Sequence, residues 1–387
     1  MEVLHERVAG LDIGKASLTV CARVPGARPG TRRAVTRTFK TTTGSLLVMR
    51  DWLVELGVTI AGDGVDVDVL EAAVLLPGAG DDGVAAREHG LLAPSFVPPP
   101  KIRRLRLLTR YRVQLLGDRT RDSVRLELML EDASIKLSTV ASSLNTVSAR
   151  AMLQAMIAGE RDPMALAQLA KGRMRVKIPD LAQALTGSFT VHHAQLARSI
   201  LHRLDLVEQA LAELDVAIET ACLPWAHQME LLQTIPGVGP KVAQVIIAET
   251  GGDMSQFPSA AHLASWAGLS PAVYESAGRR SPAGTRHGNK WLTAMLVEAA
   301  GSVGRMNGAN YLSAQHARLT RRRGMGRAQV AVAHSILVCA YYILQRDEPY
   351  QDLGPDWLER RDKDAQTRRL VAQLQRLGHT VVIDPAA

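Results

Sequence analysis

The chain of 387 residues is long enough to bury the cores of two or three domains, and its formal net charge of +8 suits a polyanionic partner. Its three cysteines fit neither a disulfide framework nor a zinc site, which excludes a disulfide-stapled secreted protein and indicates a reducing cytoplasm. We expect no signal peptide and no membrane partner, because the longest apolar run, Val330 to Leu344, is too short for a bilayer and is interrupted by His334 and Ser335.

The first predicted element is a strand that begins at Val8 and carries Asp12, with Gly14 opening the turn to a second strand over residues 18–21. RNase H-like folds begin with a strand that carries an inward carboxylate and is followed by glycine, and their Asp holds Mg²⁺ for phosphodiester chemistry. A β-hairpin with a surface Asp has the same pattern. Apolar residues at helical spacing then predict an amphipathic helix from Gly44 to Leu56.

The following stretch, residues 62–87, is dominated by acidic and small residues. The close spacing of Asp63, Asp66 and Asp68 resembles the oxygen ligands of a calcium loop, but the Glu that such a loop needs downstream is missing. A short polar strand has the same alternation.

A proline-rich linker, Pro94 to Pro100, precedes a predicted long helix from Lys101 to Leu137. We expect an apolar stripe of Ile102, Leu105, Leu108 and Leu115 to pack inward. Nine cations cover the rest of the first seven turns, with only Asp118 and Asp122 to offset them. A charged run is usually a solvated face, but this excess favours contact with a nucleic-acid backbone. The predicted contact residues are Arg103, Arg104, Arg106 and Arg110.

Shorter helices follow over residues 152–185, and a heptad seam then runs from Ile200 to Ile218. Its apolar residues alternate spacings of four and three, which predicts a coiled coil. An ordinary bundle helix with a narrow apolar face fits the spacing equally well. The spacing does not say whether the seam pairs within one chain or between two.

Two glycines, Gly237 and Gly239, separate two apolar helical patterns and are followed by Pro240 and Lys241. The glycines allow a tight turn, and proline suits the first position of the next helix. Such a helix-hairpin-helix directs free backbone N–H groups at an anion, which here predicts a DNA phosphate. An ordinary αα-corner is the alternative.

A basic loop follows between Ser276 and Lys290, and it carries a second serine, Ser281. Its other cationic side chains are those of Arg279, Arg280, Arg286 and His287. The loop could be only a charged surface. A serine hydroxyl among guanidinium groups is also what covalent attack on a phosphodiester needs, because the arginines would stabilise charge on the phosphorane.

The segments IPGVGP, SWAGLSP, ESAGRR, RHGNKWL and VAHSILVCAYYIL occur in an order that resembles the C-terminal domain of DEDD-type insertion-sequence transposases. These are the Piv-like, bridge-RNA-guided serine recombinases, and the resemblance runs from about Pro94 to about Ile383. It implies that Ser276 is the nucleophile, that Asp12 is the first acid of a Mg²⁺ site, and that the coiled coil joins subunits of a homo-oligomer. It also implies DNA as substrate, a possible structured guide RNA, and a cytoplasmic, nucleoid-associated location.

The chain departs from this family between Ile60 and Arg87, where neither the expected Met-Glu-Ser/Ala-Thr strand nor the Asp-bearing segment occurs. Codons for residues 63–78 read one base later can spell the missing strand. We therefore predict a frameshift near Ile60 and a deletion near Arg87, which would leave Asp12 as the remaining acid of four. One carboxylate does not provide the Mg²⁺ geometry that phosphoryl transfer needs, so this copy is expected to lack a competent metal site.

The predicted architecture is α/β plus α, in four segments. Residues 1–93 form an incomplete RNase H-like domain, 94–226 the arginine-rich helix and coiled coil, 227–350 a helical transposase domain, and 351–387 a basic tail. Within the tail we expect a helix from Asp352 onward and a short strand from Thr380 to Ile383. The predicted function is DNA transposition or recombination. A nuclease resembling Holliday-junction resolvases and a non-enzymatic nucleic-acid binding protein are the alternatives.

Overall fold

The computed structural model describes residues 6–13, 16–28, 31–58, 60–61, 65–66, 98–272, 274–276, 278–281, 284–357, 360 and 363–382. The chain divides into two compact units, Met1–Pro100 and Lys101–Ala387. Most of the stretch for which we predict a frameshift and a deletion lies outside the described residues.

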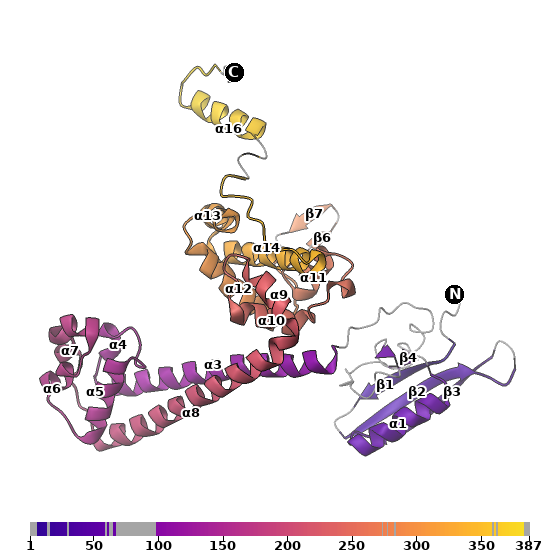
Figure 1. Cartoon of the computed structure of the whole chain (residues 1–387), viewed down its shortest axis with the longest axis horizontal. Coiled ribbons are helices and arrows are strands. Elements are labelled where there is room, and N and C mark those ends of the chain that lie inside the picture. The colour runs from indigo at the N-terminus through magenta and orange to yellow at the C-terminus, as the bar shows by residue number, and fades with distance from the viewer. Residues whose placement is uncertain are drawn as a thin grey trace. The chain divides into compact units, whose positions relative to one another are not determined.

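The first unit contains one sheet of strand order β3-β2-β1-β4-β5 (Figure 1). Its elements are β1 (Val8–Ile13), β2 (Ser17–Pro25), β3 (Arg32–Lys40), α1 (Thr43–Glu55), β4 (Ile60–Ala61) and β5 (Val65–Asp66). The first three strands pair antiparallel, and β4 pairs parallel to β1. Alternate residues of β2 are buried, and they form one core with Met49 and Leu53 of α1, which confirms the amphipathic helix.

The second unit begins with a long antiparallel helix pair, which we call the arm (Figure 1). The arm consists of α3 (Pro100–Asp132) and α8 (Val191–Cys222). Between them come α4 (Leu137–Val140), α5 (Val147–Ala158), α6 (Pro163–Gln168), the 3₁₀ helix η2 (Gly172–Lys177) and α7 (Ile178–Ala184). The first helix was expected to reach Leu137. It ends five residues earlier because the backbone turns at Ser134, whose φ is +60°.

Three polar contacts fix the register of the arm. Arg112 of α3 pairs with Asp215 of α8 at 2.6 Å, Asp122 pairs with Arg203 at 3.1 Å, and Asp132 contacts His193 at 3.0 Å. The numbers rise along α3 as they fall along α8, so the two helices are antiparallel.

The apolar residues of the heptad seam on α8 pack against α3 of the same chain. Leu204, Leu211 and Ile218, seven residues apart, are buried, and Ile218 shares a core with Ile102 and Leu105 of α3. Leu204 shares a core with Leu126 of α3. The alternative in which the seam pairs within one chain therefore holds for these three positions, and pairing between subunits through residues 200–218 stays a prediction.

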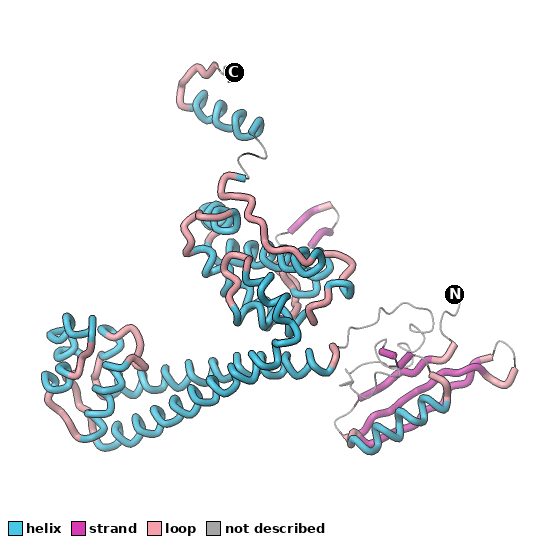
Figure 2. Tube along the Cα trace, in the orientation of Figure 1, coloured by secondary structure: helices cyan, strands magenta, loops and turns pink. Residues whose placement is uncertain are grey.

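The remainder of the second unit is a helical domain, and in Figure 2 the strands β6 and β7 stand out from its helices. Its elements are η3 (Leu223–Trp225), α9 (Ala226–Gln233), α10 (Pro240–Thr250), η4 (Met254–Gln256), α11 (Ala260–Ala267), β6 (Tyr274–Ser276), β7 (Arg279–Ser281), α12 (Lys290–Gly304), α13 (Tyr311–Arg323) and α14 (Met325–Arg346).

The apolar helix α14 is the core helix of this domain. Val332, Ala333, Ile336 and Leu337 are fully buried in the same cluster as residues of α10 and α12. Among the described residues α14 alone has the length and composition that could cross a membrane, and its burial in the domain explains that composition.

A last helix, α16 (Lys363–Arg376), confirms a helix in the basic tail. It was expected from Asp352 onward, but Asp352 to Asp356 are not helical. The strand expected from Thr380 is not present in the described residues Thr380 to Val382, which have no regular structure, and Ile383 lies outside them.

Candidate nucleic-acid interface

The predicted turn between two helices is present between α9 and α10. Gly237 has φ +83°, and a Cβ there would lie 2.5 Å from Val303 Cγ2, so only glycine fits against α12. Gly239 is the N-cap of α10, and Pro240 takes its first position. This confirms a tight turn between two helices, which the helix-hairpin-helix and the αα-corner share. That the backbone N–H groups of this turn bind a DNA phosphate stays a prediction.

Lys241 is engaged inside the chain. Its Nζ lies 2.8 Å from Asp215 Oδ1 and 3.8 Å from Glu219 Oε1, both on α8. Burial pushes the pKa of Asp215 upward, but hydrogen bonds from Arg112 and Lys241 outweigh it and hold that pKa below its usual range. The hairpin lysine therefore fastens α10 to the arm, and its role as a contact to DNA stays a prediction.

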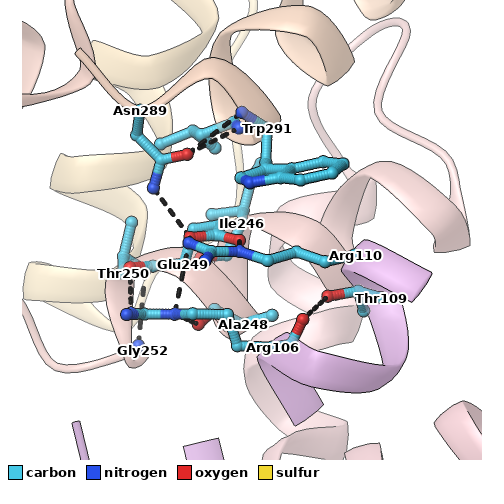
Figure 3. A network of polar contacts seen from close by, with 11 residues as sticks. Arg106, Thr109, Arg110, Ile246, Ala248, Glu249, Thr250, Gly252, Asn289 and Trp291 are labelled. Carbon is cyan, nitrogen blue, oxygen red and sulfur yellow. Dashed lines mark hydrogen bonds and ion pairs between the residues drawn. The ribbon is translucent and has the colours of Figure 1, made fainter. Parts of the chain in front are cut away.

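A buried carboxylate, that of Glu249 on α10, organises a second network (Figure 3). Arg110 donates to it from Nε and Nη2, each at 2.8 Å, in a bidentate pair. Arg106 Nε lies 3.4 Å from Oε2 and also donates to the carbonyl oxygens of Ala248 and Glu249. Asn289 donates from Nδ2 to Oε2 at 2.7 Å. Burial lowers the pKa of Arg106, with Glu249 opposing that effect.

Much of the cationic face of α3 is thus paired with acids, two of them on distant helices and two on α3 itself. Carboxylates pair with Arg106, Arg110, Arg112, Arg121 and Arg125. Because Arg106 and Arg110 are held by Glu249, both have a structural role, and their contact with DNA stays a prediction. Arg103 is half-buried, and Arg104 remains exposed.

The predicted serine loop contains a short hairpin. Its two strands pair antiparallel, with Ser276 opposite Arg279 and Glu275 opposite Arg280. The side chains of Ser276 and Arg280 lie outside the described residues. Arg279, Arg286 and Lys290 are exposed, and Lys290 Nζ lies 5.1 Å from the ring centroid of Trp291.

We use the name serine loop for residues 269–287, whose two ends meet at a neck formed by Gly268 and Gly288. A Cβ on Gly288 would lie 2.3 Å from the backbone N of Gly268 and 2.5 Å from the carbonyl oxygen of Ala267. Directly after the neck, Asn289 accepts from the backbone N–H groups of Trp291 and Leu292 and caps α12. The same side chain that caps α12 therefore also contacts Glu249.

A further exposed cationic cluster of this domain was not predicted from the sequence. We call it the arginine corner, and it surrounds the turn at Gly324, whose φ is +83°. Its members are Arg318, Arg321, Arg322, Arg323 and Arg327. All five are exposed, and none has a hydrogen-bond or ion-pair partner among the residues that the structure describes. The run Arg321-Arg322-Arg323-Gly324-Met325-Gly326-Arg327 was the available signal.

A cavity of about 1040 Å³ connects the serine loop with the arginine corner. We call it the hairpin cavity. The loop contributes Leu269, Pro271, Gly284 and Thr285, and helices α13 and α14 contribute Gln315, Arg323, Gly326, Arg327, Val330, Ala331, His334 and Ser335. The bridge between Pro271 and Thr285 holds the loop residues together at its edge.

The expected metal residue Asp12 lies on β1, opposite Thr19 of β2. Its side chain is exposed rather than inward, in contrast to the buried Leu11 before it. Within the described ranges no group of three or more His, Cys, Asp or Glu residues could hold a metal ion. The described residues around Asp12 do not fit a Mg²⁺ site, and we derive no chemical step through one.

The exposed, unpaired arginines and the basic loop are typical of a protein that binds a polyanion. Residues 229–317 match the model of the Transposase IS116/IS110/IS902 family. The chain is similar to an uncharacterised 42 kDa protein of insertion element IS900 from Mycobacterium paratuberculosis, with 32% identity over 44% of this chain and 46% of that protein. It is also similar to an uncharacterised 44.8 kDa protein of IS116 from Streptomyces clavuligerus, with 27% identity over 56% and 58%.

A third similar protein is the pilin gene-inverting protein of Moraxella bovis, with 28% identity over 32% of this chain and 39% of that protein. The chain thus spans about half the length of these relatives. These matches support the resemblance to insertion-sequence transposases of the IS110/IS116/IS902 group.

Proposed function

We propose that this protein is an insertion-sequence transposase that cuts and rejoins DNA, with Ser276 as the nucleophile. The observation that carries the proposal is that the family match, the serine loop and the unpaired arginines lie in one region of the helical domain. The segment that matches the transposase family, residues 229–317, contains the serine loop, and the hairpin cavity joins this loop to the unpaired arginines Arg323 and Arg327. The similarity to a gene-inverting protein favours recombination within this class.

The proposed reaction needs a nucleophile and stabilisation of charge. The Ser276 hydroxyl oxygen would form a bond to phosphorus and lose its proton, while the bond from phosphorus to one sugar oxygen breaks and that oxygen takes up a proton. Arg279 and Arg286 would stabilise the charge on the phosphorane, with Arg280 and Lys290 holding the backbone beside it. The serine–phosphate bond conserves the phosphodiester, so attack by another strand's hydroxyl can reseal it.

Other parts of the proposal follow from the resemblance alone. These are a structured guide RNA, a homo-oligomer and a location at the nucleoid. The Mg²⁺ site that the family would build on Asp12 is expected to be incomplete in this copy. Gly237 and Gly239 would add backbone contacts to phosphate through the α9–α10 turn.

The test is a search for a covalent adduct between protein and DNA. End-labelled DNA that flanks the gene in its genome is incubated with the protein and separated on a denaturing gel. We expect a protein-linked band that Ser276→Ala abolishes and the matched control Ser281→Ala retains, with both variants still binding the DNA. Cleavage by Ser276→Ala that depends on Mg²⁺ would instead indicate a resolvase-like nuclease. Binding without cleavage by the unmodified protein would indicate a non-enzymatic binding protein.

A further inference from the structure

The hairpin cavity combines an apolar wall with neutral polar groups and a cationic edge. The wall is formed by Leu269, Pro271, Val330 and Ala331. Gln315 and His334 add polar groups to the lining, while the exposed Arg323 and Arg327 belong to the arginine corner.

The two neutral polar side chains have no partners within the described part of the protein. Gln315 Oε1 is buried without a hydrogen bond, and neither end of the amide is held by another described residue. His334 likewise makes no hydrogen bond there, and burial lowers its pKa, so the imidazole is neutral near pH 7 with one donor and one acceptor nitrogen. Buried polar atoms normally have partners, so Gln315 Oε1 is suited to a ligand that supplies a donor, and the half-buried His334 adds a donor and an acceptor to the same lining.

The size and charge of the hairpin cavity restrict that ligand. A paired duplex is too wide to enter, whereas ligand pockets for small molecules have volumes of about 300–1,000 Å³. An apolar wall with a neutral imidazole favours a neutral, flat heterocycle over a phosphate. The two arginines, in contrast, favour an anion. A nucleotide has both of these parts.

We propose that the hairpin cavity receives one unpaired nucleotide of the DNA strand that the protein processes. The base lies against the apolar wall, its edge forms hydrogen bonds with Gln315 and His334, and the adjoining phosphate is held by Arg323 and Arg327. This inference rests on the proposed function and names its substrate more closely, as DNA with a locally unpaired nucleotide.

The experiment compares two fluorescently labelled duplexes by anisotropy. One carries a single unpaired 2-aminopurine and the other is fully paired. We expect the full-length protein to prefer the first by about tenfold, the scale of one stacked base, and to change the 2-aminopurine fluorescence. Ala331→Trp, which fills the hairpin cavity, should abolish the preference and leave affinity for the paired duplex unchanged. Gln345→Trp, at an exposed position of the same helix, is the matched control.

A second variant, Gln315→Leu, keeps the cavity volume and removes the hydrogen bonds, and it should reduce the preference if Ala331→Trp does not fold by circular dichroism. Equal binding of the two duplexes by the unmodified protein would overturn the inference, as would a preference that survives in the folded variants. A duplex with an abasic unpaired site that binds as tightly as the 2-aminopurine duplex would also overturn it. Failure to bind either duplex would instead contradict the proposed function.

Discussion

The guanidinium of Arg110 and the carboxylate of Glu249 face each other in two parallel hydrogen bonds of 2.8 Å. The two residues are 139 positions apart, so this pair fastens the arm helix α3 to α10 of the helical domain. Because Glu249 is completely buried, its charge depends on Arg110, Arg106 and Asn289 for compensation.

Removing this carboxylate should be costly. Glu249→Ala leaves two partly buried guanidinium groups without their anion, and we expect a loss of about 3–5 kcal/mol in the free energy of unfolding, measured by urea denaturation. Glu230→Ala, at an exposed acid on α9, is the control and should be near neutral. Equal stability of the two variants would mean that the Glu249 network contributes nothing to the fold.

The arginine corner should dominate the salt dependence of DNA binding. Replacing Arg321, Arg322 and Arg323 by Ala should reduce the slope of log affinity against log salt by about 0.9 for each DNA phosphate that these side chains neutralise. The comparison is the double variant Lys101→Ala and Arg104→Ala on α3, whose side chains are also exposed. If the α3 variant flattens the slope and the corner variant does not, the interface lies on the arm, as the arginine-rich sequence of α3 predicts.

The seam of the arm should behave as an intramolecular core. The register of the crossing ion pairs places Leu115 of α3 opposite Leu211 of α8, and both are buried. Leu211→Glu should therefore reduce the free energy of unfolding by about 3 kcal/mol or more without changing the mass measured by light scattering. Leu206→Glu, at a position that is 52% exposed, should change little. If Leu211→Glu instead lowered the mass measured by light scattering and left the free energy of unfolding unchanged, the seam would pair between chains.

The neck of the serine loop should not tolerate a side chain. Gly288→Ala places a Cβ within 2.3–2.5 Å of the backbone of Ala267 and Gly268, and we expect a loss of about 1–3 kcal/mol by thermal denaturation. Gly284→Ala is the matched control in the same loop, because a Cβ there would meet no atom within 4 Å. If Gly288→Ala left the thermal stability unchanged, the two backbones at the neck would be able to move apart.

Local patterns predicted the elements whose structure depends on neighbours in sequence. The apolar spacing of residues 44–56 predicted α1, and Gly237 with Pro240 predicted the turn before α10. The strand expected at Thr380 failed because four residues with strand propensity do not form a strand without a partner.

Contacts between distant segments could not be predicted in this way. The cations of α3 were expected to be offset only by Asp118 and Asp122, but Glu249 and Asp215 come from helices far along the chain. The arginine corner is the opposite case. Its five members have no acid opposite them in the described fold, a property that the run of arginines alone does not reveal.

The neck at Gly268 and Gly288 has a consequence for how this domain can diversify. Residues 269–287 leave and rejoin the helical scaffold where two backbones touch, and Leu269 at the start of the segment is packed in the helical core. The length and sequence of that excursion can therefore change while α11 and α12 keep their positions. The segment proposed to contact DNA is therefore a replaceable insertion, which could be exchanged between related proteins that retain Gly268 and Gly288.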